Sequence, residues 1–116
     1  LTKHVRTKSI LLRVNKRIIM NILSDNDLKT YMNGNQMYVT KTICDSDFKT
    51  QFEANKVYQI EGIIIDWFAD NHVCIEIYYE GMECRFFRTG TNLSLYAEMK
   101  HLFIPISEMY EAWKLS

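Results

Sequence analysis

The residues of this 116-residue chain whose types could support catalysis are three histidines, three cysteines and a pair of aspartates. A nucleophilic cysteine needs a histidine close to it in space, so Cys74 or Cys84 with His101 is the pair that the sequence leaves open. No spacing in the chain indicates such a pair, and the cysteines show no CxxC motif of a metal site. We therefore expect a protein that is not an enzyme and holds no cofactor or metal.

Asp66 and Asp70 flank Trp67 and Phe68 beside a predicted turn. Two carboxylates near a loop suit acid–base or cation chemistry, but we favour the interpretation that they are solvated turn residues. The aromatic pair either packs against the end of the sheet or stands exposed as an anchor for a partner, and both interpretations stay open. Together with polar-face residues of the next hairpin, it defines a candidate partner-binding set: Trp67, Phe68, Glu76, Tyr78, Arg85 and Phe87.

A three-stranded antiparallel meander over residues 57–87 is the element that must position this set. Residues 72–79 alternate apolar and polar with the period of a strand, and Glu80-Gly81 suits a two-residue hairpin loop. That loop would set Ile77 opposite Cys84 and Glu76 opposite Arg85, which leaves one face of the hairpin apolar. We expect Gly62 to mark a bulge and residues 63–65 to be buried on both faces of a central strand.

The rest of the chain supplies flanking elements. The cap cluster at residues 24–27 and the stop at residues 33–35 predict a short N-terminal helix. Residues 37–44 predict an edge strand interrupted by Lys41, residues 45–55 a connecting loop, and residues 100–104 a short closing strand that ends before Pro105. Ser107 can cap a last helix whose apolar stripe is Ile106, Met109, Tyr110 and Trp113. Residues 88–92 predict a polar loop, and residues 93–99 a helical turn or an irregular segment.

The segment Phe52-Glu53-Ala54-Asn55-Lys56-Val57-Tyr58 resembles the turn that opens the second strand in small SH3-like β-barrel proteins of phages and prophages. Asn55 stands where that pattern usually has glycine, and asparagine tolerates a left-handed backbone. The similarity covers roughly residues 37–104. It implies a mainly β fold, a small, partly open antiparallel SH3-like barrel with flanking helices, and it implies little about activity.

Charge divides the chain into two parts. Residues 1–19 hold six basic and no acidic side chains, whereas residues 20–116 hold fourteen acidic and eight basic ones. We expect a basic extension over 1–19 and one small domain over 20–116. Two interpretations of the extension are open: a native basic arm, or residues that precede a natural start at Met20, which we favour.

The net negative charge of residues 20–116 discriminates among the functions that a small β-rich protein could have. Nucleic-acid binding requires clustered Lys and Arg, so it is expected here only through the extension, with Lys3, Arg6, Arg13 and Arg17 as its contacts. No apolar run approaches the roughly 18 residues of a membrane span, and an odd cysteine count favours a cytoplasmic protein. We expect a phage or mobile-element accessory protein that binds a host protein with a basic surface and modulates or inhibits it. The oligomeric state stays open.

Overall fold

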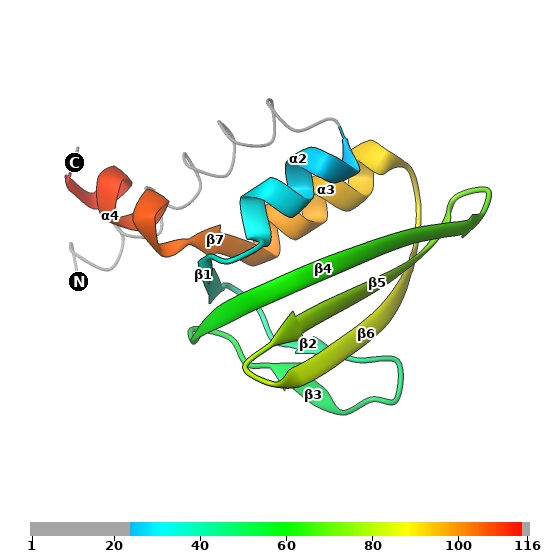
Figure 1. Cartoon of the computed structure of the whole chain (residues 1–116), viewed down its shortest axis with the longest axis horizontal. Helices are drawn as coiled ribbons and strands as arrows, with labels where there is room; N and C mark the ends of the chain where they lie inside the picture. Colours follow the sequence, from blue (N-terminus) through cyan, green and yellow to red (C-terminus); the bar gives the residue numbers. More distant parts are fainter. Residues whose placement is uncertain (1–23, 115–116) are drawn as a thin grey trace.

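The computed structural model describes residues 24–114, of which 111–114 are described by their backbone alone, and it consists mainly of antiparallel β-structure (Figure 1). Within the described residues, five strands form one open sheet in the order β6-β5-β4-β1-β7, and two short strands, β2 and β3, form a second sheet. The elements in chain order are α2 (Asp25–Met32), β1 (Gln36–Val39), β2 (Ile43–Cys44), β3 (Thr50–Phe52), β4 (Val57–Ala69), β5 (His72–Tyr79), β6 (Met82–Thr89), α3 (Asn92–Leu102), β7 (Phe103–Pro105) and α4 (Ile106–Lys114).

The meander of β4, β5 and β6 confirms the register that the Glu80-Gly81 loop predicts. Ile77 lies opposite Cys84 and Glu76 lies opposite Arg85. Glu80 and Gly81 both have positive φ, 48° and 76°, as a tight two-residue hairpin loop requires. The apolar face of this hairpin is buried, except that Met82 beside the loop is exposed.

A bulge in strand β4 shifts which of its side chains point toward the core. Residues 63–65 are not buried on both faces of the strand, so that expectation was wrong. The register against β5 shifts between Ile60 and Gly62, so the predicted irregularity at Gly62 is confirmed. Ile60 and Ile63 are both buried, and Ile64 between Ile63 and Ile65 keeps 48% of its surface exposed. The run is apolar, yet only one of its faces meets the core.

Residues 37–44 form parts of two strands rather than one edge strand, and this prediction was wrong. β1 is internal because β7, which comes from the end of the chain, pairs with its free side. The chain then leaves the sheet at Thr40, whose N–H donates to the Leu102 carbonyl oxygen at 3.0 Å. Lys41 lies in the break between β1 and β2, where it is exposed.

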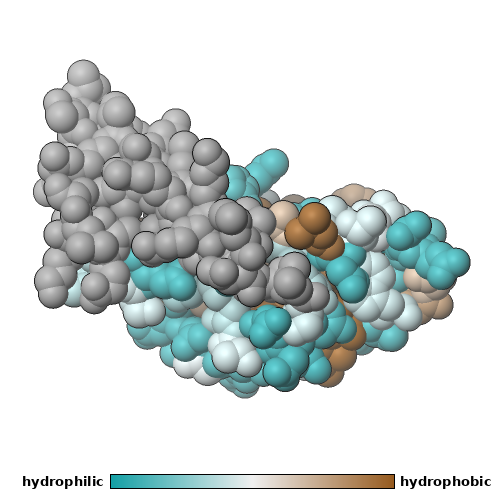
Figure 2. Space-filling model, turned by 90° about the horizontal axis from the view of Figure 1, so that it is seen from above, coloured by the Kyte–Doolittle hydropathy of each residue, from teal (hydrophilic) through white to brown (hydrophobic). Residues whose placement is uncertain are grey.

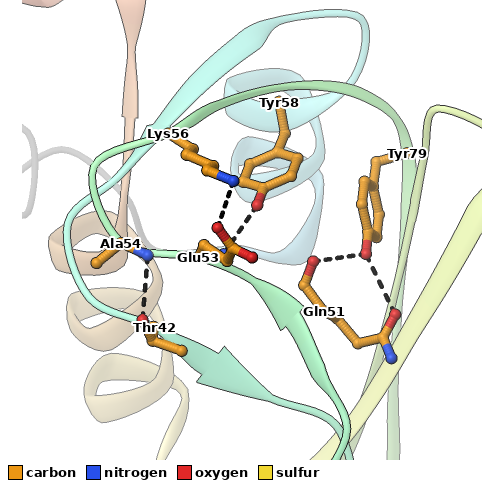
Figure 3. A network of polar contacts seen from close by, with 7 residues as sticks. All are labelled: Thr42, Gln51, Glu53, Ala54, Lys56, Tyr58 and Tyr79. Carbon is orange, nitrogen blue, oxygen red and sulfur yellow. Dashed lines mark hydrogen bonds and ion pairs between the residues drawn. The ribbon is translucent and has the colours of Figure 1, made fainter.

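Residues 45–55 contain strand β3, which the expectation of a plain loop missed. Phe52 at its end is fully buried and packs against Tyr58, Tyr79 and Phe103. Polar contacts fasten the segment to the main sheet: the Tyr79 hydroxyl donates to the Gln51 carbonyl oxygen at 2.7 Å, and the Glu53 N–H donates to the Tyr58 hydroxyl at 2.8 Å (Figure 3).

In the described residues, three helices flank the sheet. Figure 1 shows α2 and α3 above it, and the Tyr96 hydroxyl of α3 donates to the Asp25 carboxylate of α2. The N-terminal helix is confirmed, with the Ser24 hydroxyl accepting the Asp27 N–H as its cap. Residues 92–102 form α3, which takes the last residue of the predicted polar loop, the whole segment left open over 93–99 and the first three residues of the predicted closing strand. Thr91 and Ser94 form its capping box, a start signal that the sequence contains. The last helix is confirmed as α4, but it begins at Ile106, so Ser107 lies inside it and is not its cap.

The core lies between the inner face of the main sheet and these covering elements. It joins Leu28 and Met32 of α2, Tyr96 and Met99 of α3, and Phe52 of β3 to the inward residues of the sheet. Figure 2, seen from above the helices, shows hydrophilic residues interrupted by a few apolar ones. The expected mainly β fold with flanking helices and an unclosed antiparallel sheet is confirmed. Within residues 24–114, no helix combines the length and apolar character needed to cross a membrane.

Candidate functional site

The face of β4, β5 and β6 that points away from the core, here called the outer face, brings together most of the candidate partner-binding residues. Because successive side chains of a strand point to opposite faces of the sheet, every second residue of each strand lies on this face. Its described members are Ile64, Asp66 and Phe68 of β4, His72, Cys74, Glu76 and Tyr78 of β5, and Glu83, Arg85 and Phe87 of β6. Five of the six predicted residues therefore share one surface: Phe68, Glu76, Tyr78, Arg85 and Phe87.

Trp67 lies apart from those five. It is half-buried and packs against the core, on the inner side of the sheet opposite Val73. Its indole nitrogen is buried without a hydrogen-bond partner among the described residues, beside a small cavity that Arg88 and Glu98 also line. The predicted aromatic pair is thus divided, with the tryptophan packed and the phenylalanine exposed.

Aromatic and aliphatic side chains form the apolar part of the outer face. Phe68 is 56% exposed and Phe87 is 51% exposed, and their rings meet edge to face with centroids 6.1 Å apart. The ring of His72 lies 5.9 Å from that of Phe68, and Ile64 adds a third half-exposed apolar side chain. Exposed apolar side chains that gather on one face mark an interaction surface more often than the same residues scattered singly.

Strand alternation places Phe68 on this face, two residues after Asp66, and a bulge lies at this point of the strand. The register between β4 and β5 shifts between Trp67 and Ala69, so Phe68 has no directly opposed residue in β5. A bulge turns side chains out of the regular alternation and increases the local twist, and this device is frequent next to functional surfaces. The turn at Asn71, whose φ is 60°, then returns the chain into β5.

An ion-pair network forms the polar part of the outer face. Arg85 Nη2 lies 3.1 Å from Glu76 Oε1 and 3.3 Å from Glu83 Oε1, and the Tyr78 hydroxyl donates to Glu76 Oε2 at 2.6 Å. The hydrogen bond to the Glu76 carboxylate raises the pKa of Tyr78, and the charge of Glu76 raises the pKa of Arg85. With Asp66 beside them, three carboxylates face one guanidinium, so the outer face is acidic.

The two cysteines considered as candidate nucleophiles lie on opposite faces of one hairpin. Cys74 lies on the outer face and Cys84 on the inner face of the same hairpin, as the register predicts, and both thiols are free. Burial raises the pKa of Cys84 to about 12 and raises the pKa of Cys74, whereas a nucleophilic thiol needs a lowered one. Among the described residues, no three His, Cys, Asp or Glu side chains gather as a metal site would require.

Two exposed apolar residues were missed by the sequence analysis, Ile64 on the outer face and Phe48 in the loop between β2 and β3. Ile64 was assigned to a doubly buried strand, although carrying the Gly62 bulge through the alternation would have placed it on the outer face. Phe48 lies in the segment 45–55 that was predicted as a connecting loop, and it is the most exposed large apolar side chain that the structure describes. Lys3, Arg6, Arg13 and Arg17, the candidate nucleic-acid contacts, lie outside the described residues.

Comparisons of the chain with protein-family models, with curated proteins and with solved structures gave no match.

Proposed function

We propose that this chain is a non-catalytic binding protein whose outer face docks onto a protein with a basic surface. The observation that supports this most strongly is the edge-to-face pair Phe68 and Phe87, half-exposed beside the Glu76–Arg85–Glu83 network. Aromatic side chains with an arginine at their side are enriched where partners bind most tightly. The resemblance to small phage barrels suggests an accessory protein that modulates a host factor.

Charge supports a basic partner. The described residues include fourteen acidic and eight basic side chains, and the one arginine of the outer face is already paired with two glutamates. A positive partner surface would be steered toward this face, and complementary charge mainly accelerates association and improves specificity. A phosphate backbone would be repelled, although bases can stack on exposed aromatic rings.

The edge of β6 favours docking on the face over addition of a partner strand. The Ser46 N–H donates to the Arg85 carbonyl oxygen at 2.9 Å, and Arg88 Nη1 donates to the Phe87 carbonyl oxygen at 2.9 Å. Strand addition needs free backbone groups along a sheet edge, and these two acceptors are already occupied. Side chains therefore remain the main means of recognition on this side of the molecule.

Retention of proteins from a bacterial lysate on the immobilised full-length chain tests the proposal. Phe68→Ala with Phe87→Ala is compared with wild type and with Tyr110→Ala, which removes an equally exposed aromatic from α4 near the opposite edge of the sheet. We expect basic proteins that wild type and Tyr110→Ala retain, that the double variant loses at least about tenfold, and that nuclease treatment leaves in place.

Two results would count against this proposal. One is retention of the same proteins by the double variant, because the outer face would then not hold them. The other is recovery of RNA or DNA in place of protein, in complexes that nuclease destroys, which would favour the alternative that residues 1–19 bind nucleic acid.

A further inference from the structure

Phe48, at the tip of the loop between β2 and β3, combines two unfavourable features. Its side chain is 91% exposed, and its backbone has a φ of 62°, in the left-handed region that is unfavourable for a residue other than glycine. Neither core packing nor turn chemistry calls for phenylalanine at such a position, where glycine or asparagine is the ordinary residue. A residue that is strained and exposed at once points to a role outside the fold.

Hydrogen bonds hold the loop in one conformation despite that strain. Asp45 Oδ1 accepts the N–H groups of Asp47 at 3.1 Å and Lys49 at 2.8 Å, and Asp45 Oδ2 accepts Gln51 Nε2 at 3.1 Å. The Phe48 N–H in turn donates to the Asp45 carbonyl oxygen at 3.1 Å. The phenyl ring is therefore presented by an ordered loop, which lowers the entropy lost when a partner binds it.

The same loop and the strand that follows it are attached to the edge of β6 and to the inner face of β5. Ser46 bonds to the Arg85 carbonyl oxygen of β6, and Gln51 is fixed by the Tyr79 hydroxyl of β5, as Figure 3 shows. A shallow hollow separates the loop from β6, lined by Asp45, Ser46 and Asp47 on one side and by Glu83, Arg85 and Phe87 on the other. A partner that covers Phe87 and this hollow would reach the loop without any rearrangement of the sheet.

We infer that Phe48 is a second anchor for the same basic protein that binds the outer face, an inference that rests on the proposed function. The partner buries the Phe48 ring in an apolar depression of its own surface. Three carboxylates line the hollow against one arginine that already pairs with Glu83, so the adjoining partner surface is positive. The binding surface thus runs from Phe68 across Phe87 to the tip of the β2–β3 loop.

Site-specific photo-crosslinking in the full-length chain tests this inference. A benzoylphenylalanine replaces Phe48, Phe87 or, as the control, Tyr110, and each protein is irradiated in a bacterial lysate. We expect positions 48 and 87 to crosslink the same basic protein and position 110 to leave it unlabelled. Phe48→Ala, introduced into the chain that carries the probe at position 87, should lower that crosslink about tenfold.

Phe48→Gly separates binding from folding, because glycine relieves the left-handed strain. We expect it to raise the midpoint of thermal unfolding by a few degrees while the crosslink from position 87 falls as it does with Phe48→Ala. The inference is overturned if the yield of the crosslink from position 87 is unchanged in both variants, or if the probe at position 48 captures a different protein. Either result leaves the proposed function intact. If the probe at position 87 crosslinks no protein, the proposed function itself is contradicted.

Discussion

At the scale of single residues, Lys100 is a charged side chain that lies buried in the fold. Its side chain is 3% exposed, and its ammonium nitrogen lies 3.1 Å from the centroid of the Tyr31 ring. Burial lowers the pKa of Lys100 to about 8, although attraction to Glu108 and Asp27 acts in the opposite direction. The same burial raises the pKa of Tyr31, whose hydroxyl donates to the Phe103 carbonyl oxygen.

Lys100→Met should stabilise the protein at neutral pH. Below pH 8 the amine is charged in the folded and the unfolded chain, so the full cost of burying that charge is present, up to about 3 kcal/mol for a shift from 10.5 to about 8. Loss of the contact with the Tyr31 ring offsets part of the gain. We expect the free energy of unfolding, measured by urea titration at pH 7, to rise by about 1–3 kcal/mol.

The difference between Lys100→Met and wild type should shrink as pH rises from 8 to 10.5. In this window the folded protein has released the proton and the unfolded chain still holds it, so wild type regains stability. Tyr79 and Cys84, whose pKa values burial raises to about 12, titrate alike in both proteins and cancel in the difference. Lys41→Met, at an exposed position, is the control, and a pH-independent loss of stability in Lys100→Met would refute this account.

At the scale of elements, the two glycines of the meander differ in what their backbones require. Gly81 has a φ of 76° in the β5–β6 hairpin loop, whereas Gly62 does not have positive φ and no atom lies within 4 Å of where its Cβ would be. Gly81→Ala should therefore lower the free energy of unfolding by roughly 1–2 kcal/mol. Gly62→Ala, its matched control, should change it by no more than about 0.5 kcal/mol.

Chemical denaturation of both variants checks this prediction. Equal effects would mean that the hairpin loop does not depend on the left-handed backbone at position 81. Because that loop sets Glu76 opposite Arg85 and orients the outer face, Gly81→Ala should also weaken retention of the partner more than Gly62→Ala does.

Local signals predicted the meander and missed the pairings between distant segments. The residues that alternate, 72–79, are next to the Glu80-Gly81 loop in the sequence. Because both signals are local, the register of β5 against β6 could be derived from them. The position of β1 depends on β7, which lies more than sixty residues away, and nothing in residues 36–39 indicates it. Thr91, the N-cap of α3, was assigned to a loop, so α3 was divided into the end of that loop, a segment left open between a helical turn and an irregular course, and the start of a strand.

The candidate site was predictable to the same extent. Register placed Phe87, Arg85, Glu76 and Tyr78 on one face, and the structure agrees. The separation of Trp67 from Phe68 follows from strand alternation, but which of the two meets the core depends on the pairing with β5. The exposure of Phe48 depends on how the β2–β3 loop attaches to β6, a contact between segments about forty residues apart.

At the scale of the whole molecule, two features matter: the main sheet is open, and acidic residues outnumber basic ones in residues 24–114. Helices α2 and α3 and the β2–β3 sheet enclose one face of the main sheet, and the outer face of β4, β5 and β6 keeps its phenylalanines half-exposed. Occupied backbone groups on β6 discourage edge-to-edge pairing, so the protein presents a face and a loop instead of a strand. Fourteen acids against eight bases in the described residues predict binding that weakens as salt rises.

The affinity of the retained basic protein for the purified chain, measured by titration calorimetry at low and high salt, tests the central claim most directly. We predict that Phe68→Ala with Phe87→Ala raises the Kd at least about tenfold, that Tyr110→Ala leaves it unchanged, and that added salt raises it for wild type. A double variant that binds with the wild-type Kd would contradict the claim that the outer face of β4, β5 and β6 is the binding surface.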